Sequence, residues 1–180
     1  MKNISILFIA FFLLSLGTFA QSQYSTINNR VIISTVVNGD TIIVENTKNK
    51  VRINGELDLF NVEYNNYEAR LVTGNGNIDS DERTDMIIKF FNEYSWLDEQ
   101  LKTTQPVNQF TDELHVTIED VEQTIPVDFL ISRFRVSNGF TVIIQVSGNF
   151  SGKDLEDDFP NLKFESELHF VITLTVQVTE

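Results

Sequence analysis

Residues 164–179, FESELHFVITLTVQVT, decide the fold of this chain. From Phe164 to Val178 the even positions are apolar, apart from Ser166, and the odd positions are mostly polar. A period of two over so long a run predicts a β-strand with one buried face and one solvated face. At about 3.3 Å per residue the strand would reach about 50 Å, so it must bend or coil, as strands do in a closed barrel.

A second strong signal is a hairpin at residues 137–139, Ser-Asn-Gly. A two-residue loop at Asn138-Gly139 sets two arginines opposite apolar residues, whereas a three-residue loop pairs Phe134 with Val142. The three-residue loop gathers the apolar side chains on one face, so we prefer that register. It also implies a β-bulge within residues 129–132, where the apolar positions change from odd to even.

Further strands follow from apolar alternation and turn residues. Asn38-Gly39 fits a two-residue hairpin loop. Residues 50–60 and 64–73 predict two strands, and residues 114–118 and 125–129 predict a pair joined by a polar turn.

One segment departs from the β pattern. Residues 79–82, DSDE, have the spacing of a helix capping box. Apolar side chains then recur at helical spacing from Met86 onward. These features predict an amphipathic helix from Ser80 to Tyr94, continuing as far as Leu101, followed by a loop.

The expected fold class is therefore mainly β, with about eight antiparallel strands and one amphipathic helix. A closed or nearly closed barrel is the simplest arrangement. A β-sandwich is the alternative.

Composition narrows the class of function. The 180 residues include 13 Lys and Arg against 26 Asp and Glu, for a formal net charge of −13, and no Cys. The acidic balance excludes a nucleic-acid binder, which needs a basic face. The absence of Cys removes disulfides and thiolate metal sites. We expect no cofactor.

The first twenty residues have the layout of a secretory signal peptide. Lys2 is followed by an apolar run over residues 4–16, and small residues precede a cleavage site between Ala20 and Gln21. The run is shorter than the roughly 20 residues of a spanning helix, so we prefer cleavage to an uncleaved anchor. We expect residues 21–180 to form one periplasmic or secreted domain, without stable membrane insertion after cleavage.

Several segments resemble the YceI family. Residues 114–127, LHVTIEDVEQTIPV, resemble its characteristic hairpin, although residues 120–122 replace the Gly-containing turn. Residues 148–159 resemble a strand followed by an Asp-Phe element, and residues 164–178 its final strand.

The resemblance extends over residues 51–180. Residues 83–92 are similar to the family's helix that ends in Phe-Phe-Asp, and residues 55–57 to its early Gly-containing strand. Membership would imply a lipocalin-like antiparallel barrel. It would also imply that a long isoprenoid or similar lipid chain is bound inside the barrel.

The candidate ligand-lining side chains are those expected inside the barrel. A hollow interior would hold a hydrophobic small molecule such as a polyprenyl or acyl chain, and a filled interior would be an ordinary core. Alternation alone does not separate these two interpretations. The candidates are Phe134, Phe140, Val142, Ile144, Val146, Leu168, Phe170, Ile172, Leu174 and Val176.

Other polar motifs are weaker. Residues 75–82 place oxygen ligands at alternate positions, but the Gly and Glu of a calcium loop are missing, so we interpret them as a turn and a helix cap. His115 and His169 fall on polar strand faces. We do not expect an enzyme, because the inward positions offer only Ser132 and Ser166. The sequence leaves the oligomeric state open, a dimer included.

Overall fold

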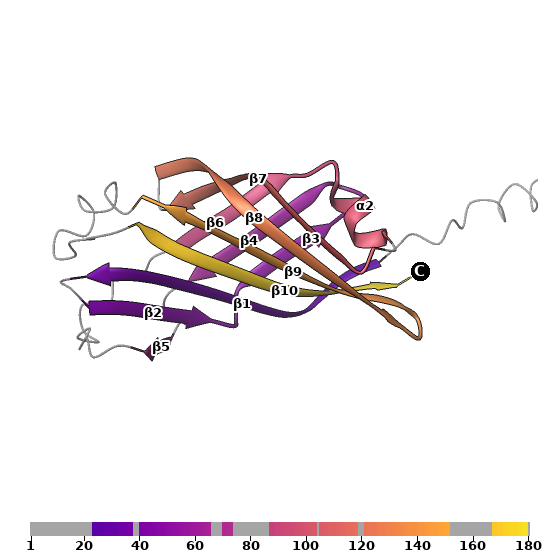
Figure 1. The fold of residues 1–180 in the computed structure, drawn as a ribbon, viewed down its shortest axis with the longest axis horizontal. Helices are drawn as coiled ribbons and strands as arrows, with labels where there is room; N and C mark the ends of the chain where they lie inside the picture. Colours follow the sequence, from indigo (N-terminus) through magenta and orange to yellow (C-terminus); the bar gives the residue numbers. More distant parts are fainter. Residues whose placement is uncertain are drawn as a thin grey trace, which may run out of the picture.

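The computed structural model describes residues 23–37, 40–65, 70–73, 87–103, 105–118, 121–151 and 167–179. They form one antiparallel sheet that curls into a barrel, with one short helix at its end (Figure 1). The mainly β, lipocalin-like barrel expected from the sequence is confirmed, although the sheet has ten strands. The elements are β1 (Gln23–Val37), β2 (Asp40–Asn46), β3 (Lys50–Asn54), β4 (Leu59–Asn65), β5 (Arg70–Thr73), β6 (Ile87–Glu93), α2 (Leu97–Lys102), β7 (Val107–Ile118), β8 (Val121–Val136), β9 (Gly139–Phe150) and β10 (Leu168–Thr179).

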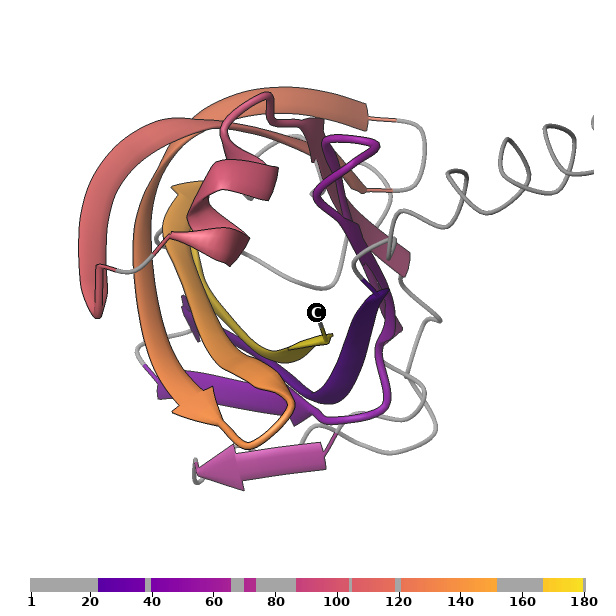
Figure 2. The same cartoon turned by 90° about the vertical axis from the view of Figure 1, so that its right-hand side faces the viewer.

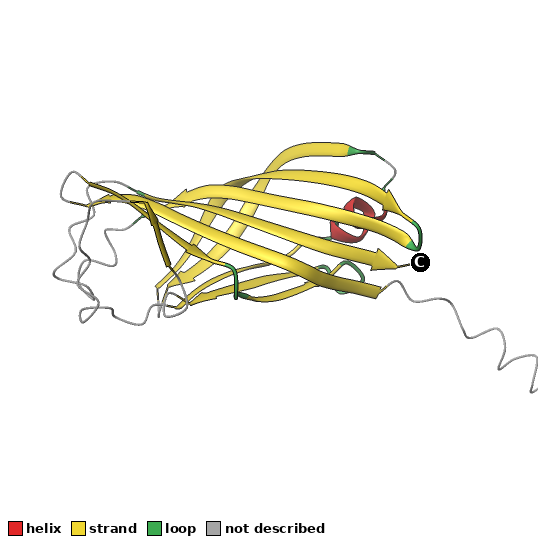
Figure 3. Ribbon diagram, turned by 90° about the horizontal axis from the view of Figure 1, so that it is seen from below, coloured by secondary structure: helices red, strands yellow, loops and turns green. Residues whose placement is uncertain are grey.

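The strand order is β3-β4-β6-β7-β8-β9-β10-β1-β2-β5. The view along the barrel shows the sheet wrapped around its interior, with α2 lying across one end (Figure 2). The C-terminal end of β10 lies near the same end (Figure 3). This end, closed by α2, is called the helix end below.

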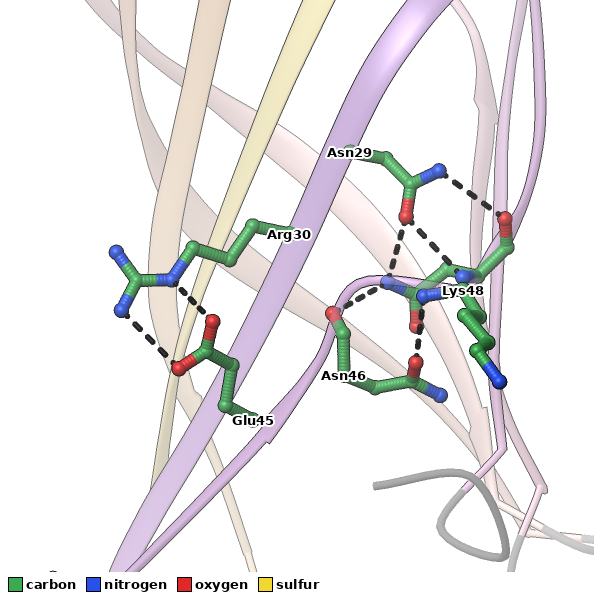
Figure 4. A network of polar contacts seen from close by, with 6 residues as sticks. Asn29, Arg30, Glu45, Asn46 and Lys48 are labelled. Carbon is green, nitrogen blue, oxygen red and sulfur yellow. Dashed lines mark hydrogen bonds and ion pairs between the residues drawn. The ribbon is translucent and has the colours of Figure 1, made fainter. Parts of the chain in front are cut away.

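An asparagine cluster closes the seam between β1 and the turn that leads into β3 (Figure 4). The Oδ1 atom of Asn29 accepts hydrogen bonds from the backbone N (3.1 Å) and the Nδ2 (2.8 Å) of Asn49. Asn49 Nδ2 also donates to the Asn46 carbonyl at 2.7 Å, and Asn46 Nδ2 donates to the Asn65 carbonyl at 2.7 Å. Side-chain amides therefore join the barrel where β1 and β3 are not neighbours in the sheet.

The alternation in the C-terminal strand is confirmed. The even residues of β10, from Leu168 to Val178, are buried, and the odd residues are partly or fully exposed. β10 pairs with β9 on one side and β1 on the other, and it places Ile172 opposite Val146 and Val31. The hairpin predicted at Asn38-Gly39 is also confirmed, because Val37 pairs with Asp40 and Ile33 with Val44.

The helix predicted from Ser80 to Tyr94 is wrong over its described part. Residues Ile87–Glu93 form β6, which pairs with β4 and β7. Ile88 and Phe90 point inward while Ile87 and Lys89 are exposed. The apolar pairs Ile87-Ile88 and Phe90-Phe91 satisfy a helical spacing and a strand alternation equally, and pairing on both sides favours the strand. Within the residues that the structure describes, the α-helix is limited to Leu97–Lys102.

The register predicted for the 137–139 hairpin is also wrong. Val136 pairs with Gly139 around a two-residue loop, so Phe134 lies opposite Thr141 and Arg133 opposite Val142. Gly139 has φ +131°, where a Cβ would lie 2.0 Å from the Val178 carbonyl oxygen. A residue with no side chain is therefore needed at this corner.

No bulge interrupts β8 in either of its ladders, contrary to the bulge predicted within residues 129–132. Two other strands were predicted with wrong limits. The run 50–60 is divided into β3 and β4 by a turn, and 64–73 contains the end of β4 and the separate β5. The predicted signal peptide (residues 1–20) and the calcium-like motif (residues 75–82) lie outside the described residues.

Candidate functional site

Nine of the ten candidate lining residues lie on the inner face of β9 and β10. Seven of them have no solvent-accessible surface at all, whereas a side chain beside a space of water size would keep some. Leu168 keeps 3% and Phe140 is only partly buried. The seven are Val142, Ile144, Val146, Phe170, Ile172, Leu174 and Val176.

Side chains from opposite walls meet in the interior. The rings of Phe90 on β6 and Phe170 on β10 lie 4.8 Å apart between centroids, although three strands separate β6 from β10. Phe150 packs on Phe170 at 5.9 Å. A Cβ at Gly148 would lie 2.9 Å from Val127 Cγ1 and 3.2 Å from the Phe170 ring. The interior at this level is filled by the protein's own side chains.

A second group of rings, the aromatic cluster, fills the interior towards the helix end. Phe129 on β8 is its centre, with ring centroids at 5.1 Å from Trp96 and 5.3 Å from both Tyr94 and Phe110. Phe60 on β4 completes the cluster at 6.2 Å from Phe129. Edge-to-face and stacked pairs at these distances are attractive beyond the area that they bury.

The helix α2 is fixed over this cluster by polar contacts. Trp96 Nε1 donates to Asp112 Oδ2 at 2.6 Å, and Asn108 Nδ2 donates to Gln100 Oε1 at 2.9 Å. Leu97 and Leu101 are fully buried on the inner side of the helix. The β3–β4 turn packs so closely on α2 that a Cβ at Gly55 would lie 2.7 Å from Asp98 Cα. These contacts make α2 a plug at this end of the barrel.

Ionisable groups join α2 to the first strand. The Tyr24 hydroxyl donates to Asp98 Oδ1, and Lys102 Nζ lies 2.8 Å from the same oxygen. Burial, followed by the bond to Asp98, raises the pKa of Tyr24 to about 12. Desolvation alone would raise the pKa of Asp98, but the bonds from Lys102 and Tyr24 outweigh it and hold that pKa below its usual value. The bond to Asp98 raises the pKa of Lys102.

Arg133 is a buried cation that the sequence reasoning placed outside the barrel. Its side chain is directed inward, where Nη1 donates to the carbonyl of Leu101 near the end of α2. The guanidinium also lies over the Phe140 ring, 3.5 Å from its centroid. The signal that could have found it is the odd-numbered apolar series of β8, Ile125 to Ile131, which simply continues to residue 133.

The structure corrects the prediction for Phe134, the tenth candidate lining residue. It was expected to point inward, but it lies on the outer face and is 54% exposed. The cause is the hairpin register, because a change of one residue moves the side chains of β8 between the predicted bulge and the turn to the opposite face. Ser132, proposed as an inward polar residue, faces outward for the same reason.

The remaining polar candidates do not converge. His169 is exposed and its Nδ1 lies 2.8 Å from Asn149 Oδ1, while His115 Nδ1 lies 2.9 Å from Thr124 Oγ1 on the outer surface. Within the described ranges, no three His, Cys, Asp or Glu residues are grouped closely enough to hold a metal ion. No helix in the described part of the chain is long and apolar enough to span a membrane.

Comparison with known proteins gives no relative. No protein-family model matches the chain, and no curated protein matches it.

Proposed function

We propose that this chain is an exported structural or adhesive β-barrel module that acts through its outer surface. The observation that carries the proposal is the contact of Phe90 with Phe170 across the interior. Rings from opposite walls in contact occupy the volume that a lipid chain would need. The aromatic cluster and α2 occupy the helix end in the same way.

The test is the content of the barrel. Native mass spectrometry and organic extraction of the purified protein are expected to give the mass of the polypeptide alone. Titration with farnesol and with oleic acid, as probes of isoprenoid and acyl chains, is expected to leave Tm and intrinsic Trp fluorescence unchanged. A co-purified lipid, or saturable uptake of either probe at one molecule per chain, would overturn the proposal.

The second candidate is a carrier of an isoprenoid or another long-chain amphipathic lipid. One observation favours it: the interior wall is apolar along its length, and Ile33, Ile125 and Leu168, at the end away from α2, keep 5%, 8% and 3% of their surface accessible. The sequence resemblance to the YceI family supports the same function. In this proposal a lipid would enter from that end, and the Phe90–Phe170 contact would have to open.

A further inference from the structure

Among the described strands, four neighbours form a stretch without carboxylates, although the chain has twice as many acidic as basic residues. β1, β9 and β10 contain neither Asp nor Glu, and in β8 none follows Asp128. These four strands are consecutive in the sheet, in the order β8-β9-β10-β1. We call their outward-facing residues, from Leu130 onward in β8, the acid-free face.

The acidic residues of the other strands mark the limits of the acid-free face. β4, β6 and β7 each carry acidic residues, and β8 carries Glu122 and Asp128 before the face begins. On the opposite side β2 carries Glu45, whose carboxylate is buried under Arg30 of β1 at 3.0 Å. Of the two acids in β2, Asp40 and Glu45, the second is thus paired with a residue of the face.

The side chains of the acid-free face form regular rows across the strands. Phe134, Thr141 and Gln177 are paired across β8, β9 and β10. The next row consists of Ser132, Ile143 and Thr175. Hydroxyl, amide and apolar groups make up these two rows, which suits them to contact with another surface that carries no carboxylates.

Exposed apolar side chains gather on the same side. The described residues include seven large hydrophobic side chains that are exposed, and four of them belong to β1 or to β8 beyond Asp128: Ile27, Leu130, Phe134 and Val136. A fifth, Val107, lies opposite Ser132 at the border of the face. Exposed apolar residues that cluster, rather than scatter, mark an interaction surface.

The charge pattern favours a second copy of the chain as the partner. Each copy carries a net charge of −13, so two copies repel each other wherever carboxylates meet. A partner with a basic surface would instead be attracted to the acidic strands. Exclusion of acids from one face is what association with an equally acidic molecule requires.

The size of the face is sufficient for a weak dimer. Four strands about 4.8 Å apart, over ten residues of about 3.3 Å each, present roughly 600 Å² per copy. Two copies would bury at most roughly 1,200 Å², at the lower end of specific interfaces. We propose that the acid-free face packs on the same face of a second copy, giving a two-fold symmetric dimer of barrels.

The test is sedimentation equilibrium of the purified chain and of three variants. Gln145→Glu is nearly isosteric and adds one carboxylate to the acid-free face, and Phe134→Glu adds one to its apolar part. Each is expected to raise the dimer Kd at least tenfold, which corresponds to about 1.4 kcal/mol. Ile87→Glu is the matched control, since Ile87 is an exposed apolar residue on β6, and it is expected to leave the Kd unchanged.

Salt gives an independent readout. Because the remaining surfaces repel each other, the wild-type Kd is expected to fall as salt rises from about 0.01 to 1 M, where the screening length shrinks from about 30 to 3 Å. A wild-type chain that stays monomeric at about 0.1 mM under high salt would overturn the proposal, since even a weak specific interface is populated there. A dimer that both face variants leave intact, or that Ile87→Glu weakens equally, would also overturn it.

The inference rests on the proposed function in one respect, that the outer surface carries the activity. The proposed function and the dimer can be contradicted independently of each other. A lipid found inside the barrel contradicts the proposed function and leaves the dissociation constants unaffected. A monomeric chain without lipid contradicts only the dimer.

Discussion

Arg133 shows how a charged side chain becomes part of a barrel core. The guanidinium is covered because it bonds the Leu101 carbonyl at the end of α2 and stacks on Phe140. A cation beside the carbonyl end of a helix is favourable, and the aromatic face adds a cation–π contact. The residue therefore links β8, β9 and α2 at the helix end.

We predict that Arg133→Ala lowers the free energy of unfolding by about 2–4 kcal/mol, since hydrogen bonds to charged groups contribute about 1.5–3 kcal/mol and the stacked ring adds to this. Urea denaturation followed by Trp96 fluorescence measures the loss. Arg135→Ala is the control: Arg135 is exposed two residues further along the same strand, and its removal is expected to change stability by less than about 0.5 kcal/mol. Equal losses in the two variants would show that Arg133 has no special role.

Tyr24 gives a pH dependence with a defined sign. Its pKa is raised from 10.0 to about 12 in the folded chain, so the folded state holds the proton more tightly than the unfolded state. The stabilisation is complete below pH 10 and is lost as the pH rises through the folded pKa. We predict that the difference in stability between wild type and Tyr24→Phe narrows between pH 10 and 12. Urea midpoints across that range measure it, and a constant difference would contradict the prediction.

Residue-level reasoning from the sequence succeeded where a strand is long and strictly alternating. The inward face of β10 follows directly from residues 164–179. It failed at residues 130–136, because both parities of β8 offer apolar side chains: Ile131 on one face, and Leu130, Phe134 and Val136 on the other. The structure resolves this ambiguity by burying Arg133 and exposing Phe134. A rule that places apolar side chains inward predicts the opposite at these two positions, although the odd-numbered series from Ile125 to Ile131 continues to Arg133.

At the level of elements, β6 connects the two walls of the interior. Phe90 contacts Phe170 across the barrel, whereas its neighbour Phe91 faces outward and stacks on His115. Two adjacent phenylalanines thus lie in opposite environments, one buried and one facing outward. The effects of the same substitution at the two positions can therefore be compared directly.

We predict that Phe90→Ala costs about 3–5 kcal/mol, because it removes a buried ring and leaves a cavity. Phe91→Ala is expected to cost less than about 1.5 kcal/mol, since only a partly exposed stacked pair is lost. Thermal and urea unfolding measure both changes. Comparable losses would mean that the interior near Phe170 readily collapses or is already loosely packed.

The helix prediction was wrong because it relied on local sequence rules alone. Residues 79–82, DSDE, and the apolar pairs that follow satisfy the local rules of a helix start. Strand pairing with β4 and β7 is not a local property, and it decides the conformation of Ile87–Glu93. The true helix has only six residues, and its position depends on contacts such as Trp96 with Asp112, which sequence spacing does not reveal.

The whole molecule is a barrel whose closure relies on side chains at one seam. β1 and β3 are joined through Asn29, Asn46 and Asn49 instead of a backbone ladder. The sequence indicated a closed or nearly closed barrel but not this arrangement, because strand order and seam contacts arise only in the assembled sheet.

We predict that Asn49→Ala destabilises the fold by about 1–3 kcal/mol, because buried polar partners are left without their hydrogen bonds. Amide hydrogen exchange is expected to rise in β3 before it rises in β9 or β10. The control is Asn28→Ala, which removes an exposed amide one residue from Asn29. Uniform exchange across all strands would contradict a seam that opens locally.

The pairing of Gln23 with Thr179 has a consequence for folding kinetics. β1 and β10 lie at opposite ends of the described chain, so β1 cannot complete its ladders until β10 has been synthesised and released. High contact order slows folding, because the entropy of closing a long loop must be lost before the contacts form. Late folding of this kind would suit the export proposed above, because a chain must be unfolded to pass through a secretion channel.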